Sequence, residues 1–141
     1  MQEKLILWKP IRRYSRELHL KELLLEKGLK ITFEDDDGKV IIFHYDRYHN
    51  ETYILSYRVT EEYIRSADLH QKLTNAKEEL DKPNGNWALF KVKNSNYVSW
   101  YDSLPGPGTD LNPQIEHHVY ICSDYVIDVI STYEPSVTVV E

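Results

Sequence analysis

Histidines that lie next to carboxylates are the residues of this chain whose types and spacing could do chemistry. His44 stands two positions before Asp46, and His117 and His118 directly follow Glu116. Imidazole and carboxylate groups can exchange a proton or bind a metal ion. Adjacent residues of a strand point to opposite faces of a sheet, so His117 and His118 cannot both line one site without a bulge. A small metal- or ligand-dependent enzyme that uses His44, His117 or His118 is therefore the alternative reading.

Other catalytic patterns are absent from the sequence. Cys122 is the single cysteine, which excludes a disulfide within the chain and a zinc-binding cysteine pattern, and it is expected to be a small buried hydrophobe. Ser56, Ser95 and Ser99 lack a Gly-x-Ser-x-Gly elbow. The segment 105–108 places prolines at two positions where a phosphate-binding loop would need N–H donors. We expect no cofactor, no metal and no catalytic residue.

Charge is distributed unevenly along the chain. The first thirty residues contain eight Lys or Arg and four Glu, whereas no Lys or Arg follows Lys93 and the last 48 residues carry seven carboxylates. A basic cluster of Lys9, Arg12, Arg13 and Arg16 could contact phosphates. The rest of the chain, at −10 when the net charge is −6, would repel a polyanion. Nucleic acid is therefore not the expected partner.

The acidic part of the chain is also rich in aromatic residues. In the whole chain tyrosine accounts for eleven of the seventeen aromatic side chains, and Trp100 and Tyr101 lie in the acidic part. Carboxylates steer and orient a basic protein, while Tyr and Trp anchor it in an interface. This composition favours a protein-binding inhibitor that blocks a toxin or other basic partner with an acidic, aromatic face. The predicted contact residues are Trp100, Tyr101, Asp102, Asp110, Glu116 and Asp124.

Hydrophobic periodicity predicts the elements that must position these residues. Residues 29–34 and 39–45 alternate with period two around the turn sequence at 35–38, which predicts a β-hairpin. The leucine spacing in 15–27, followed by Gly28, predicts a short helix that ends at the glycine, and an extended arm is the alternative for this segment. One helix or two short ones are expected from Thr60 as N-cap to Leu80, and another short helix after a cap at Asn94-Ser95. Further strands are expected at 5–8, 53–59, 87–92, 116–122, 125–132 and 137–140.

These elements predict an α+β fold. We expect one domain over residues 1–141, with a mixed or antiparallel sheet of about six strands and two or three short helices packed on it. No apolar run reaches the roughly 20 residues that cross a bilayer, and the N-terminus lacks a signal sequence, so a cytoplasmic protein without a membrane partner is expected. The edge segment 137–140 leaves open an oligomer of unknown size.

Four segments resemble a set of small proteins from Gram-positive bacteria. The resemblance lies in Tyr53-Ile-Leu-Ser-Tyr-Arg58, the segment from Trp87 to Trp100, Glu116-His-His-Val-Tyr-Ile121 and Asp128-Val-Ile-Ser-Thr-Tyr-Glu-Pro135. In size and acidity the chain is similar to immunity proteins that neutralise secreted polymorphic toxins. The resemblance implies an inhibitory protein-binding function and assigns no functional residues.

Overall fold

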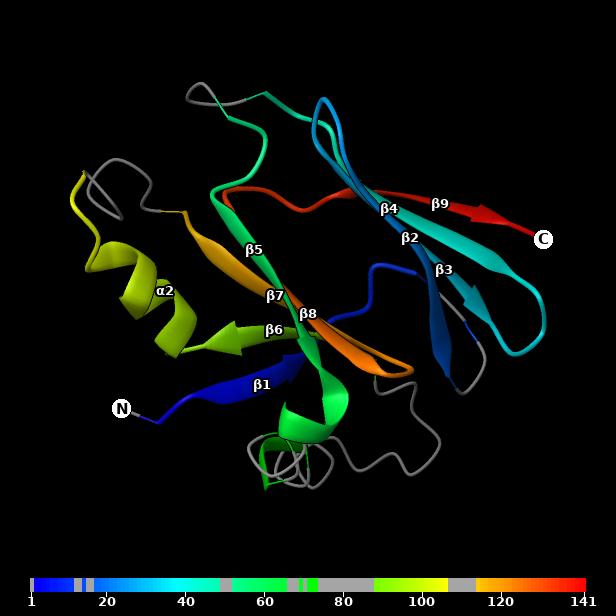
Figure 1. The fold of residues 1–141 in the computed structure, drawn as a ribbon, viewed down its shortest axis with the longest axis horizontal. Coiled ribbons are helices and arrows are strands. Elements are labelled where there is room, and N and C mark those ends of the chain that lie inside the picture. The colour runs from blue at the N-terminus through cyan, green and yellow to red at the C-terminus, as the bar shows by residue number, and fades with distance from the viewer. Residues whose placement is uncertain are drawn as a thin grey trace.

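The computed structural model describes residues 2–11, 14, 17–48, 52–65, 69, 71–73, 88–106 and 114–141. Within these ranges nine strands form two antiparallel sheets (Figure 1). The five-stranded sheet A has the spatial order β1 (Lys4–Leu7), β6 (Leu89–Lys93), β7 (Glu116–Cys122), β8 (Tyr125–Ser131), β5 (Ser56–Glu61). The four-stranded sheet B has the order β2 (Leu18–Leu25), β3 (Leu29–Asp35), β4 (Val40–Tyr45), β9 (Ser136–Val140). The α+β prediction is confirmed, but the described strands form two sheets instead of the single sheet of about six strands that was expected.

The hairpin predicted over residues 29–45 is present as β3 and β4. Asp35 Oδ1 accepts hydrogen bonds from the backbone N–H groups of Asp37 and Lys39, each at 2.9 Å. Gly38 completes the turn with a φ of 84°, a conformation that glycine adopts without a Cβ penalty. The register pairs Phe33 with Ile41, and both side chains are fully buried. Local alternation and turn chemistry therefore determine this part of the fold.

The helix predicted over residues 15–27 is wrong, because this segment contains strand β2. A β-bulge between Leu20 and Glu22 interrupts the alternation of β2 against β3. The bulge lets Leu20 and Leu23, three residues apart, both pack against the core, and this spacing resembles that of a helix. Gly28 is not a helix C-cap but belongs to the connection between β2 and β3, with a φ of 116°.

Among the described residues, short helical segments occur at 62–65, at 69 and 71–73, and at 96–102. Helix α2 (Asn96–Asp102) follows β6, and its N-cap Ser95 accepts a hydrogen bond from Val98 N–H at 3.0 Å, which confirms the predicted cap. Residues 62–65 form a helical turn directly after β5. The Glu61 carboxylate, rather than the predicted Thr60, accepts hydrogen bonds from the first N–H groups of this turn. No helix among the described residues is long and apolar enough to cross a membrane.

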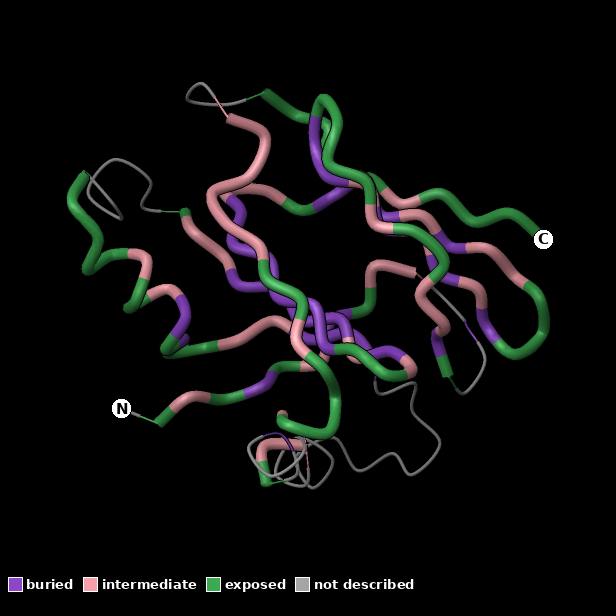
Figure 2. Tube along the Cα trace, in the orientation of Figure 1, coloured by how far each residue is buried: buried purple, intermediate pink, exposed green. Residues whose placement is uncertain are grey.

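The central strands β7 and β8 of sheet A are buried on both faces, which decides where their polar side chains can act. Its inner face packs against sheet B, and the buried residues shown in Figure 2 concentrate along β3, β4, β7 and β8. On its outer face a smaller cluster contains Leu5, Leu69, Phe90, Val119 and Val126. Successive residues of β7 therefore enter two different environments.

Candidate functional site

A buried polar cluster on the outer face of sheet A contains His117. Its Nε2 lies 2.7 Å from Asp128 Oδ1, and its Nδ1 lies 2.7 Å from Ser95 Oγ. Asp128 is fully buried and His117 is 3% exposed. With a proton on Nε2, the His117 ring donates to the Asp128 carboxylate, and the Ser95 hydroxyl forms the hydrogen bond at Nδ1. The three residues therefore form a continuous hydrogen-bonded chain from β8 through β7 to the start of α2.

Two arginines complete the surroundings of Asp128. Arg58 Nε lies 3.0 Å and Arg65 Nη1 2.8 Å from Asp128 Oδ2. The antiparallel register places Arg58 directly opposite Asp128 on neighbouring strands. Burial by itself would raise the pKa of the Asp128 carboxyl, but hydrogen bonds and charge from His117 and Arg65 outweigh burial and hold its pKa well below the ordinary value. Asp128 is therefore a buried anion.

Tyr97 connects this cluster to the molecular surface. The Arg58 guanidinium carbon lies 4.1 Å from the centroid of the Tyr97 ring, and the edge-on His117 ring lies 5.3 Å from it. The Tyr97 hydroxyl hydrogen-bonds to Ser56 Oγ. Trp100 stacks on Tyr97 at a centroid distance of 5.6 Å and remains 50% exposed. An exposed indole thus rests on a buried ionic and aromatic support.

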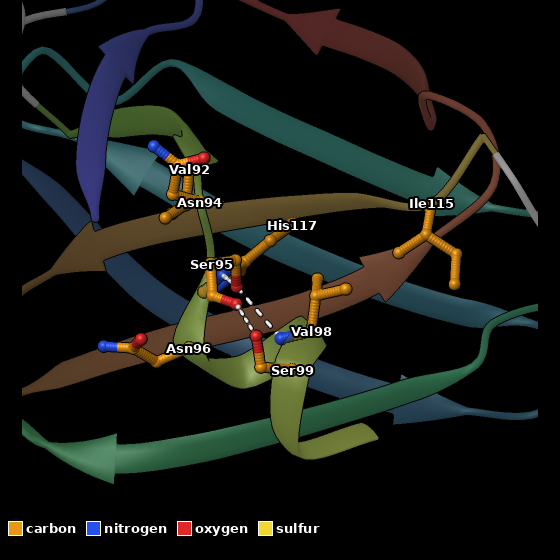
Figure 3. Close-up of a pocket in the computed structure, with 8 residues that line it drawn as sticks. All are labelled: Val92, Asn94, Ser95, Asn96, Val98, Ser99, Ile115 and His117. Atoms are coloured by element: carbon orange, nitrogen blue, oxygen red, sulfur yellow. Dashed lines mark hydrogen bonds between the residues drawn. The ribbon is translucent and has the colours of Figure 1, made fainter. Parts of the chain in front are cut away.

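Ser95 and His117 also line a pocket of about 450 Å³ beside α2 (Figure 3). Ser–His–Asp chains can activate a serine hydroxyl for attack on a carbonyl group. Here Ser95 contacts Nδ1 and Asp128 contacts Nε2, and the Ser95 oxygen also accepts the cap hydrogen bond from Val98. The remaining lining residues are Val92, Asn94, Asn96, Val98, Ser99 and Ile115.

His118 belongs to a second network, on the inner face of sheet A. Its Nδ1 lies 2.7 Å from the Tyr45 hydroxyl, which lies 2.6 Å from the Tyr120 hydroxyl. Its Nε2 lies 2.9 Å from Glu116 Oε1, and its ring stacks on Trp8 at 4.7 Å. Burial lowers the pKa of His118, while the hydrogen bond from His118 lowers the pKa of Glu116. When His118 is neutral, each polar group in this network can pair a hydrogen-bond donor with an acceptor.

The structure therefore separates the histidines that the alternative reading considers. His117 and His118 lie on opposite faces of β7, as strand alternation predicts. His44 lies on β4, and its Nδ1 is 3.9 Å from Asp46 Oδ2. Arg12, Arg13 and Arg16 of the basic cluster lie outside the described residues.

The predicted contact residues are only partly brought together. Trp100, Tyr101 and Asp102 share the last turn of α2. Glu116 begins β7 and is half-buried, with Oε2 3.3 Å from Lys91 Nζ. Asp124 occupies the turn beyond the other end of β7, so the length of a seven-residue strand separates it from Glu116. Asp110 lies outside the described residues.

One group with metal-ligand chemistry was not identified from the sequence. Glu17, His19 and Asp36 offer ligand atoms within 4.8 Å of one another, and they are the only such group of three among the described residues. His19 Nε2 lies 2.7 Å from Asp36 Oδ1, and its Nδ1 lies 2.9 Å from Ser123 Oγ. Both ring nitrogens are therefore engaged within the chain. The pairing of β2 with β3 brings the ends of the two strands that carry this group together, and no local sequence signal indicated it.

No protein-family model matches the chain, and neither curated proteins nor solved structures give a match.

Proposed function

We propose that this chain is a protein-binding inhibitor of the immunity type, which neutralises a toxin or other basic partner by covering it with an acidic, aromatic face. The observation that carries the proposal is the position of Trp100. Half of this large side chain is exposed, although it is stacked on the buried Tyr97. Aromatic anchors of this kind dominate the binding energy of many protein interfaces.

The support beneath Trp100 favours binding because it reduces the entropy lost on association. Arg58 lies over the Tyr97 ring and is itself bonded to the buried Asp128. Tyr97 is held at its hydroxyl by Ser56. A side chain that is already held in its bound geometry loses less conformational freedom when a partner arrives. Trp100 is thus a pre-organised anchor.

Charge around this anchor favours a basic partner. Asp102 is exposed in the same helix, and Leu104, just beyond it, is 41% exposed. The chain carries no Lys or Arg after Lys93, so every fixed charge on the residues that follow α2 in the sequence is negative. Such a field raises the association rate with a basic protein, and added salt screens it.

The test begins with the partner, captured from the source organism by crosslinking and identified by mass spectrometry. Binding of the purified partner is then measured for the wild-type chain and Trp100→Ala, with Tyr48→Ala as the matched control because Tyr48 is an exposed tyrosine on another part of the surface. We expect Trp100→Ala to weaken binding roughly 30-fold, the usual size of a hot-spot loss. Unchanged affinity for Trp100→Ala would overturn the proposal.

The pocket supports one second candidate, a small hydrolytic enzyme in which His117 activates Ser95. The supporting observation is the unbroken chain from Ser95 to Asp128 at the pocket wall. Hydrolysis of p-nitrophenyl acetate and covalent labelling by a fluorophosphonate test it, with Ser99→Ala as the control for Ser95→Ala. Labelling of Ser95 that disappears in Ser95→Ala and persists in Ser99→Ala supports the enzyme, and absence of labelling in the wild-type chain excludes it.

A further inference from the structure

We propose that a second surface, at the end of β5 and β8, contacts a lysine- and arginine-rich face of the partner protein. This surface consists of Glu61, Glu62, Tyr63, Ile64, Asp124 and Tyr125, and is named here the β5–β8 patch. The inference rests on the proposed function and deepens it, because it names a contact site away from α2 and the chemistry of the partner there.

Backbone hydrogen bonds make the patch one continuous surface. Glu62 N–H donates to Asp124 C=O at 2.9 Å, and Asp124 N–H donates to Glu62 Oε2 at 3.2 Å. Glu61 is the cross-strand partner of Tyr125. The helical turn that follows β5 therefore sits directly beside the β7–β8 turn, at the lower end of sheet A in Figure 1. Residues more than sixty positions apart in sequence thus share one rigid end of the sheet.

The patch presents large apolar side chains to solvent. Tyr63 is 83% and Ile64 is 74% exposed, and these are the two highest values among the large hydrophobic side chains of the described residues. Tyr125, across the strand pair, is 42% exposed. The Glu61 carboxylate accepts hydrogen bonds from the N–H groups of both Tyr63 and Ile64, which fixes the turn that carries them. Exposed apolar groups on a fixed backbone are typical of an interaction surface.

The carboxylates of the patch determine which partner it fits. Glu61, Glu62 and Asp124 are exposed, and none forms an ion pair with a cation among the described residues. The arginines closest in sequence, Arg58 and Arg65, both donate to the buried Asp128. Three carboxylates beside two exposed tyrosines complement Lys and Arg side chains, which can pair with the carboxylates and lie over the rings.

NMR titration with a short oligolysine peptide tests the patch before the partner is known. At about 20 mM salt we expect chemical-shift changes centred on residues 61–64 and 124–125, which disappear at about 200 mM salt. Oligoglutamate at the same concentrations serves as the negative control. Oligolysine shifts centred elsewhere, for example on the turn at 35–38, would overturn the inference.

A charge-matched pair of variants separates the patch from general acidity. Glu62→Gln with Asp124→Asn removes two charges from the patch, leaves the Glu61 cap in place, and introduces asparagine at a φ of 71° that asparagine tolerates. Glu22→Gln with Glu26→Gln removes two exposed charges from the β2 region. We expect the patch variant to weaken oligolysine binding about fivefold and the β2 variant to leave it unchanged. Equal weakening by both would overturn the inference.

The captured partner then distinguishes this inference from the proposed function. The expected result is that the patch variant and Trp100→Ala each weaken partner binding. Loss of binding by Trp100→Ala with full binding by the patch variant overturns the patch alone. Full binding by both variants overturns both the patch and the proposed function.

Discussion

His117 Nε2 lies 2.7 Å from Asp128 Oδ1, and this contact joins strands β7 and β8 on the outer face of sheet A. The carboxylate of Asp128 is fully buried and also accepts hydrogen bonds from Arg58 and Arg65. The Asp128 carboxylate therefore links β8 to its two neighbours, β7 and β5, and to the helical turn that follows β5. The ring of Tyr97, which supports the exposed Trp100, packs against the His117 ring and the Arg58 guanidinium, the groups that bond to Asp128.

Replacing Asp128 should destabilise the fold strongly. Asp128→Asn leaves Arg58 and Arg65 near a neutral amide, and loss of one partner from a buried ion pair typically costs about 3–5 kcal/mol. Asp124→Asn is the control, because Asp124 is exposed in a turn whose conformation suits asparagine. Urea unfolding of the two variants measures the free energy of unfolding. Equal losses in the free energy of unfolding for Asp128→Asn and Asp124→Asn would contradict a structural role for Asp128.

Stability should fall as the solution is acidified below about pH 6.5, because of His118. Burial lowers the folded-state pKa of His118 below its ordinary value of 6.5, so the unfolded chain binds a proton that the folded chain excludes. The contribution of His118 to the free energy of unfolding is therefore fully present above pH 6.5 and is lost as the pH falls toward the folded-state pKa. In urea unfolding at pH 7.5 and 5.5, His118→Gln should lose less stability between the two pH values than the wild-type chain. The same loss in both proteins would contradict this assignment.

Cys122 should resist alkylation while the chain is folded. The thiol is buried, donates a hydrogen bond to Tyr125 C=O at 3.3 Å, and has its pKa raised to about 12 by burial. The thiolate is the reactive form, so iodoacetamide at pH 8 should modify the native chain far more slowly than the urea-unfolded chain. Mass spectrometry follows the reaction. Equal rates in the two states would show that Cys122 is accessible.

Gly28→Ala should destabilise the chain more than Gly38→Ala. A Cβ at Gly28 would lie 2.2 Å from Tyr45 C=O oxygen, and the φ of 116° is strained for any other residue. A Cβ at Gly38 would have nothing within 4 Å, although its φ is 84°. We expect a loss of at least about 2 kcal/mol at Gly28 and of about 1 kcal/mol at Gly38. Thermal unfolding of both variants gives the comparison, and a reversed order would refute the proposed close contact.

Local patterns in the sequence were enough to predict several features of the molecule. Period-two alternation and the turn at 35–38 predicted the β3–β4 hairpin. The cap at Ser95 was predicted from residue type, and the burial of Cys122 from its apolar neighbours. The opposite directions of His117 and His118 followed from their adjacency in a strand. Each of these depends on residues close together in the chain.

The tertiary structure alone decided the features that depend on distant pairings. Leu20 and Leu23 have a spacing that suits a helix, and only the bulged pairing with β3 makes their segment a strand. The Ser95–His117–Asp128 chain needs the order of strands in sheet A, which no local pattern contains. Side-chain type and periodicity are determined within a few residues, whereas a site is made by strands that pair across the whole chain. The sequence therefore determined an acidic, aromatic α+β chain, and the strand pairings decided where its charges and rings meet.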